Sequence, residues 1–219
     1  GLRLDNLHYS VRSQEPVFGL LNSGSGQASL FQPKAGLAWN VTPQHELYAN
    51  AGVGFHSNDA RCATLTTAPH TGAGAQSVPA IVRGTGTELG WKFAPAEDFF
   101  TSVSLWTLKM GSELVFVGDA GTTEAGRPSR RAGLEFITRW VATPGLKFDL
   151  TWAQSRARFA GVPPAGDGNL IDNSVNRVIS AAAVWQRDAW QTSLQLRHMG
   201  PRPLDTSGAV MSSSTTLLN

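Results

Sequence analysis

The chain has 219 residues, a formal net charge of +2, 16% charged residues and 41% hydrophobic residues. The charged fraction lies below the value of about a quarter that is usual for globular proteins, and the net charge is too small to argue for nucleic-acid binding. A single cysteine, Cys62, excludes an intramolecular disulfide framework, and the longest apolar run, residues 179–185, is much shorter than a membrane-spanning helix requires.

Apolar and polar residues alternate with period two in most segments of strand length. The alternation is clearest in residues 31–41, 46–58, 131–142 and 190–199, and it is weaker in 102–118. Period two is the pattern of a β-strand with two different faces, whereas an amphipathic helix repeats every 3.6 residues or so. The sequence therefore predicts an all-β protein.

The connections between these segments alternate between short and long. The short ones fall at residues 42–45, 95–98, 143–145 and 187–189, and the long polar ones at 61–79, 118–128, 161–176 and 200–213. Antiparallel strands with short turns at one end and long loops at the other are typical of outer-membrane barrels. We therefore expect a transmembrane antiparallel up-and-down β-barrel with its short turns on the periplasmic side.

Tryptophans support this interpretation. Trp39, Trp91, Trp140 and Trp190 each lie within a few residues of a short turn, on the apolar side of their segment. Indole is apolar apart from one N–H group, so it favours the boundary between lipid and water, where barrels carry aromatic girdles. Soluble sandwiches also alternate, but they tend to bury tryptophan in the middle of strands. We predict that these four residues form the periplasmic-side girdle.

Several motifs follow one another in a characteristic order. They are PKAGL at 33–37, YANAG at 48–52, GFHSNDAR at 54–61, ELGWK at 88–92, SELVFVGDAG at 112–121, RPSRRAGLE at 127–135 and GPRPL at 200–204. Each is weak alone, but together they span nearly the whole chain. In this order and spacing the sequence resembles the C-terminal portion of the β-barrel of TonB-dependent outer-membrane receptors.

The resemblance implies a barrel of about 22 strands whose lumen holds an N-terminal plug. Such receptors lie in the bacterial cell outer membrane and import scarce nutrients, such as ferric siderophores, haem or vitamins, with energy passed through TonB. We count about ten strands, and the chain starts and stops inside patterned segments. Residues 1–219 are therefore expected to be a partial barrel without the plug, the TonB-contacting box and the last strands.

One compact cluster could bind a metal or a ligand. His56 and Asn58 share the polar face of their segment, but Asp59 points the other way in a regular strand. A hydrogen-bond network in the lumen is the favoured interpretation, with His56 and Asn58 as possible ligand contacts. Cys62 paired with His56 or His70 lacks a third group that would orient a nucleophile and its base. We expect no catalytic site, no metal site, no cofactor and no enzymatic activity.

Arginines gather toward the expected extracellular end. Arg131 and Arg197 share the lumen face and could contact an anionic ligand. The favoured alternative is that they pair with lumen carboxylates, for which the candidates are Glu88, Glu113 and Glu135, because an unpaired charge in a crowded lumen is costly.

Two further arginines are expected to face outward. Arg156 and Arg158 have the parity of Leu150 and Trp152, which puts them on the lipid side just above the hydrocarbon. Guanidinium groups bind phosphate well, so we predict contacts with lipopolysaccharide phosphates.

Three functions are compatible with the sequence. The leading hypothesis is the barrel wall of an energy-coupled importer, with outer-membrane lipid and lipopolysaccharide, the TonB complex and a small nutrient as partners, and no nucleic acid. The alternatives are a passive outer-membrane porin or channel, which would have no plug, and a soluble β-sandwich binding module, which would stay in the aqueous fraction without detergent.

Overall fold

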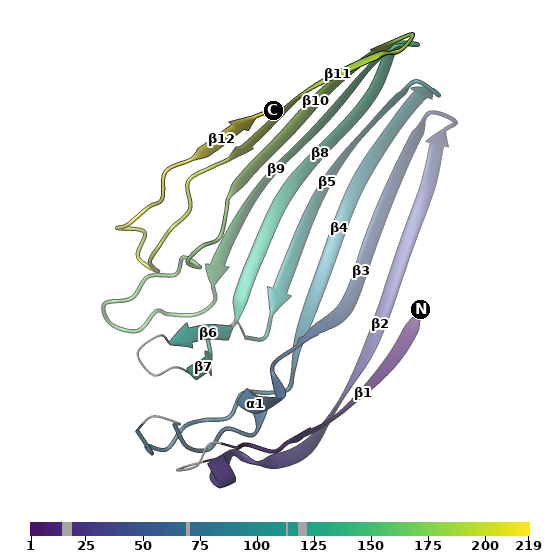
Figure 1. Ribbon diagram of the computed structural model, residues 1–219. Coiled ribbons are helices and arrows are strands. Elements are labelled where there is room, and N and C mark those ends of the chain that lie inside the picture. Colours follow the sequence, from purple (N-terminus) through teal and green to yellow (C-terminus); the bar gives the residue numbers. More distant parts are fainter. Residues whose placement is uncertain (15–18, 69–70, 113, 118–121) are drawn as a thin grey trace. The chain divides into compact units, whose positions relative to one another are not determined.

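The computed structural model describes residues 1–14, 19–68, 71–112, 114–117 and 122–219 (Figure 1). Strands dominate it. They are β1 (Leu2–Val11), β2 (Gly24–Thr42), β3 (His45–Ser57), β4 (Ile81–Ala96), β5 (Phe99–Met110), β6 (Leu114–Val117), β7 (Thr122–Ala125), β8 (Ser129–Thr143), β9 (Leu146–Phe159), β10 (Arg177–Arg187), β11 (Trp190–Met199) and β12 (Thr215–Leu218). The helical elements among these residues are one 3-10 turn, η1 (Gly19–Asn22), and one short helix, α1 (Ala60–Ala63). In the described part of the chain, no helix has the length and apolar character needed to cross a membrane.

Ten strands form one sheet in the order β1-β2-β3-β4-β5-β8-β9-β10-β11-β12, and β6 pairs with β7 in a separate hairpin. Neighbours in the sheet follow one another along the chain, except that the β6–β7 hairpin is inserted between β5 and β8, so the topology is an antiparallel up-and-down meander (Figure 1). The predicted all-β class and antiparallel meander are confirmed. The order is open, with β1 and β12 at its two ends.

Tight turns join β2 to β3, β4 to β5, β8 to β9 and β10 to β11, at the places that the sequence predicts. Between β10 and β11, Asp188 has a φ of 52°, in the left-handed region. Hairpin turns of two residues favour this region because it matches the twist of the flanking strands, and aspartate tolerates it better than most residues.

Contacts divide the chain into two compact units. The first contains residues 1–35, 52–86 and 109–129, and the second contains 36–51, 87–108 and 130–219. All of the tight turns named above belong to the second unit. We call that end of the second unit its turn end, and the opposite end, which carries the connections β9–β10 and β11–β12, its loop end.

The first unit has a small core under the connection between β3 and β4. Its buried apolar residues are Val53, Leu65, Val78, Ala80 and Val82. The buried side chain of Asn22 fastens this connection to η1, because Asn22 Oδ1 accepts from the backbone N–H groups of Thr66 and Thr67, both at 3.0 Å. Asn22 Nδ2 donates to the Thr67 carbonyl at 2.8 Å. The amide thus pairs backbone groups that no strand ladder satisfies.

The second unit is a sheet with one apolar and one polar face. In its ladders Leu150 lies opposite Ala181, Thr151 opposite Ser180, and Ser180 opposite Arg197. Residues that lie opposite one another share a face, so the polar face carries Asp149, Thr151, Ser180, Gln195 and Arg197. The apolar face is exposed: Leu37, Trp190 and Leu194 are 70%, 75% and 56% exposed. Exposed apolar surface of this extent is typical of a face that contacts lipid or another protein.

Glycine makes room for a bulky neighbour on the polar face. A Cβ atom at Gly133 of β8 would lie 2.6 Å from the ring of Trp106 and 2.9 Å from the backbone oxygen of Gln154. The indole could shift, but the backbone oxygen belongs to the neighbouring strand and cannot. Gly133 is therefore a packing requirement of this part of the sheet.

We predict that Gly133→Ala destabilises the folded protein by about 1–3 kcal/mol, the usual cost of forcing an extra methyl group into a packed site. Thermal unfolding followed by the circular dichroism of the sheet measures this. Gly54→Ala is the matched control, because a Cβ atom at Gly54 would meet nothing within 4 Å. Equal melting temperatures for Gly133→Ala and the native protein would contradict the packing argument.

Candidate functional site

The polar face of the second unit is a connected network across β3 and β4. Tyr48 Oη donates to Glu88 Oε1 at 3.0 Å, and Asn50 Nδ2 donates to Glu88 Oε2 at 3.3 Å. Lys92 Nζ pairs with Glu46 Oε1 at 2.7 Å and lies 5.0 Å from the centre of the Tyr48 ring. These groups satisfy one another, which holds the side chains in fixed positions on this face.

Farther along the same face, Arg139 Nε of β8 lies 3.5 Å from Asp149 Oδ1 of β9. Asp149 also borders a groove of about 400 Å³ whose lining includes Thr151, Gln195 and Arg197. The groove combines a cation, a carboxylate and neutral polar groups, so it can accept a polar ligand with hydrogen-bonding groups of both kinds.

The predicted lumen residues occupy this face or lie beside it. Arg197 is exposed on β11, and Arg131 is half-buried on β8. Of the candidate carboxylates, Glu88 accepts hydrogen bonds from Tyr48 and Asn50, Glu135 is half-buried on β8, and Glu113 lies outside the described residues. Whether the two arginines serve a ligand or a carboxylate stays a prediction.

His56 and Asn58 lie in the first unit and contact each other. His56 Nε2 lies 3.1 Å from Asn58 Oδ1, and Asn58 Nδ2 donates to the Pro79 carbonyl at 2.6 Å. Asn58 is buried, and its amide closes the base of the β3–β4 connection. Whether this pair faces the lumen or a ligand stays a prediction. Within the described ranges, no group of three or more His, Cys, Asp or Glu could hold a metal ion, and His70 lies outside those ranges.

The predicted girdle residues lie at the turn end of the second unit. Trp39 and Trp190 are 60% and 75% exposed, and Trp140 stacks on Phe148 with ring centres 5.7 Å apart. Trp91 Nε1 donates to His45 Nδ1 at 3.1 Å. His45 also stacks on Phe93, with a centroid distance of 4.6 Å. The geometry gives aromatic side chains along one end of the apolar face, and their contact with a membrane interface stays a prediction.

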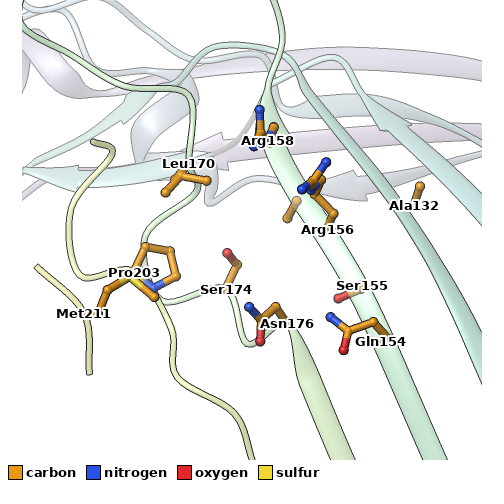
Figure 2. Close-up of a pocket in the computed structure, with 11 residues that line it drawn as sticks. Ala132, Gln154, Ser155, Arg156, Arg158, Leu170, Ser174, Asn176, Pro203 and Met211 are labelled. Carbon is orange, nitrogen blue, oxygen red and sulfur yellow. The ribbon is translucent and has the colours of Figure 1, made fainter. Parts of the chain in front are cut away.

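The loop end of the second unit holds a cavity of about 490 Å³ (Figure 2). Arg156 and Arg158 lie near the C-terminal end of β9 on one side, and Leu170, Pro203 and Met211 lie on the other (Figure 2). The two loops that supply these walls are joined, because Leu170 N donates to the Thr206 carbonyl at 2.9 Å and Asn173 N donates to the Pro203 carbonyl at 2.8 Å.

Asp205 holds one of these loops in shape. Its carboxylate accepts from Ser207 Oγ at 2.9 Å and from the backbone N–H groups of Gly208, Ala209 and Val210. The Ser207 hydroxyl, followed by these backbone N–H groups, lowers the pKa of Asp205 from its ordinary value of 3.8, against an opposing effect of burial.

Sequence patterns did not reveal all of these contacts. Lys92 and Glu46 carry opposite charges, and the alternation of their strands puts both on the polar face, each a few residues from a tight turn. Counting residues from these turns could therefore have predicted the pair. The cavity walls Leu170, Pro203 and Met211 come from long loops, where no periodic signal exists.

Comparison with known proteins gives a consistent result. A sequence model of the family described as TonB dependent receptor-like, beta-barrel, matches residues 1–219. No curated protein matches the chain. Solved structures do, and they are similar in fold at low sequence identity.

Three of these structures illustrate the match. The copper transporter OprC has a TM-score of 0.72 and 14% identity, with 99% of this chain and 36% of that one covered. The FrpB iron transporter from Neisseria meningitidis has a TM-score of 0.69 and 15% identity, covering 99% and 34%. The ferric-catecholate import receptor Fiu from E. coli K12 has a TM-score of 0.65 and 16% identity, covering 90% and 29%. The chain spans about a third of the length of these proteins.

We predict that Asp205→Asn increases amide hydrogen exchange in residues 205–212 at neutral pH, because the amide is a weaker acceptor than the carboxylate for the Ser207 and backbone donors. A carboxylate with a lowered pKa stabilises the fold above its unfolded-state pKa and loses this contribution as the pH falls through the folded-state value. In the native protein, hydrogen exchange in residues 205–212 should therefore increase only at a pH below 3.8, the ordinary pKa of an aspartate such as Asp205.

Hydrogen exchange read by mass spectrometry gives both results. Asp167→Asn is the control, since Asp167 is exposed and its side chain has no hydrogen-bond or ion-pair partner among the described residues. If the Asp205 and Asp167 variants exchanged alike, the carboxylate would not be what orders the loop.

Proposed function

The chain belongs to the TonB-dependent receptor family of β-barrel proteins, and from this premise we propose that it forms part of the wall of an outer-membrane importer of scarce nutrients. Members of the family are transport receptors of the bacterial outer membrane and are not enzymes. The proposal places the apolar face of the sheet against lipid and the polar face toward the lumen. The turn end then lies on the periplasmic side and the loop end on the extracellular side.

The observation that carries the proposal is the contrast between the two faces. Large apolar side chains such as Leu37, Leu194 and Trp190 are exposed on one face, which would be unfavourable in water. On the other face Glu88 and Lys92 have polar partners within the sheet. A lipid phase outside and a polar lumen inside satisfy both faces together.

The proposed cargo is a metal-containing nutrient complex, such as a ferric siderophore. The solved structures similar to this chain include a ferric-catecholate import receptor, an iron transporter and a copper transporter, and this supports the class. Energy coupling would need a plug that contacts TonB. Since the chain spans about a third of these proteins, we place the plug and the remaining strands outside residues 1–219.

Within the lumen we propose that Arg197 contacts an anionic ligand, with Arg131 as a second candidate. Arg197 is exposed and borders the polar groove, which supports this role. His56 is a weaker candidate, and Asn58 is a positioning residue, because its amide is engaged by Pro79. At the turn end we propose that Trp39, Trp91, Trp140 and Trp190 anchor the barrel at the membrane interface.

We predict that bacteria expressing the full-length receptor accumulate radioactive iron from a ferric siderophore panel only when TonB is present. In the same cells, Arg197→Ala should weaken binding of the recognised complex by roughly tenfold, the effect of losing one charge-assisted contact. Arg187→Ala at the turn end is the matched control and should bind as the native receptor does.

The outcomes separate the alternatives. Uptake without TonB, together with steady ion conductance of the purified receptor in planar bilayers, would establish a passive channel. Recovery of the receptor as a monomer in the aqueous fraction without detergent would establish a soluble binding module. Unchanged ligand affinity in Arg197→Ala would remove the ligand role of that residue and leave its pairing within the lumen.

A further inference from the structure

The loop end of the second unit carries a cluster of arginines on its apolar face. Arg156 and Arg158 of β9 alternate with Ser155 and Ala157, so both lie on the face of Gln154. On the neighbouring strand Arg177 lies opposite Gln154, and its Nε donates to Gln154 Oε1 at 3.1 Å. We call Arg156, Arg158 and Arg177 the arginine site.

This site extends onto the strand on the other side of β9. Ala132 of β8 lines the same cavity as Arg156 and Arg158 (Figure 2). Arg130 precedes Ala132 by two residues and is exposed, so alternation along β8 puts it on the same face. Three adjacent strands, β8, β9 and β10, therefore carry arginines on this face near the loop end.

Among the described residues, no carboxylate pairs with Arg156 or Arg158. Both are exposed, and neither guanidinium group has a hydrogen-bond or ion-pair partner in that part of the chain. Other arginines of the chain do have carboxylate partners: Arg139 pairs with Asp149, and Arg61 pairs with Asp59. Like charges two residues apart on a strand lie only about 7 Å from each other, so an anion between them would be strongly favoured.

Guanidinium geometry indicates which anion fits. The planar guanidinium group of arginine can donate two parallel hydrogen bonds to two oxygen atoms of a phosphate. A lysine ammonium group, in contrast, acts as a point charge without this paired geometry. The cavity of about 490 Å³ beside Arg156 and Arg158 has room for a phosphorylated headgroup. Leu170, Pro203 and Met211 form an apolar wall opposite the charges.

The surroundings indicate that the phosphate is carried by a lipid. Continuing down β9 on the same face come Trp152, Leu150 and Phe148, and the last two are 37% and 36% exposed. A free phosphate ion would contact only the arginines. A phosphorylated lipid would contact the arginines with its headgroup and the apolar residues of β9 with its acyl chains.

We propose that the arginine site binds a phosphate group of an outer-leaflet glycolipid, lipid A of lipopolysaccharide, and fixes the height of the barrel wall in the membrane. Arg156 and Arg158 hold the phosphate, and the Arg177–Gln154 hydrogen bond keeps β10 in register beside them. The site is outside the lumen and takes no part in choosing the cargo. The inference rests on the proposed function, because it requires the apolar face to meet lipid.

The test uses the full-length receptor, purified and stripped of lipid, with lipid A carrying both phosphates as the probe. Native mass spectrometry measures the affinity of the receptor for this probe, for lipid A from which the phosphates have been removed, and for the intact probe in the presence of inorganic phosphate. The variant is R156Q/R158Q, which removes both charges from exposed positions. The matched control is R187Q, which removes one charge from the opposite end of neighbouring strand β10. The milder variant R156K/R158K keeps the charges and loses the planar guanidinium groups.

The expected result is a loss of roughly tenfold or more in affinity for the phosphorylated probe in R156Q/R158Q. R187Q should bind as the native receptor does, R156K/R158K should lie between them, and the dephosphorylated probe should bind weakly and equally to all four proteins. Unchanged affinity in R156Q/R158Q would overturn the proposal. Complete displacement of the lipid by millimolar phosphate would also overturn it, because the site would then recognise a free ion.

Failure of the proposed function would look different. If the native receptor imports nothing but R156Q/R158Q still binds the phosphorylated lipid more weakly, the result supports the arginine site and contradicts the importer. A receptor that imports its cargo normally and shows no difference between R156Q/R158Q and R187Q contradicts the arginine site alone. The heat-dependent shift of a folded barrel in gel electrophoresis confirms in each case that the variants are folded.

Discussion

Hydrogen bonding between backbone groups of antiparallel strands is the constraint on which this structure depends. Each ladder, such as β9–β10–β11, fixes which residues lie opposite one another and therefore which face each side chain takes. A slip of one residue between β10 and β11 would move Arg197 to the apolar face and Leu196 to the polar one. In lipid the constraint is stricter, because no water is present to form hydrogen bonds with unpaired backbone N–H and C=O groups. Register, faces and proposed environment are consequences of one pattern.

Given these faces, packing on the polar side relies on pairing large residues with glycine. The ring of Tyr48 lies over Gly90, the indole of Trp106 lies against Gly133, and Asn50 lies over Gly36. A single sheet layer leaves no internal core for such groups, so each bulky side chain lies along the surface of a neighbouring strand where the partner has no Cβ atom. This arrangement also orients Tyr48 toward Glu88 and so builds the polar network.

Sequence periodicity predicted the strands, the tight turns and the two faces because each of these depends on local pattern. Parity puts Arg197 on the polar face, and the ladder places it opposite Ser180 of that face. The loops were not predictable in this way. Asn22 reaches Thr66 and Thr67, and Leu170 reaches Thr206, through contacts between segments far apart in the chain. The buried position of Asn58 has the same origin, since its partner Pro79 lies across a long connection.

The central claim is that alternate residues of one strand face lipid and lumen, and a spin-label scan of β11 tests it most directly. Single cysteines at positions 190–199 of the full-length receptor, in a Cys62→Ser background and reconstituted in lipid, carry the label one at a time. Electron paramagnetic resonance then compares collisions with oxygen, which concentrates in lipid, and with a water-soluble nickel complex. The account predicts strong oxygen accessibility at Trp190, Thr192, Leu194 and Leu196, and low oxygen accessibility at the residues between them. Equal accessibility to the nickel complex at all positions would contradict it.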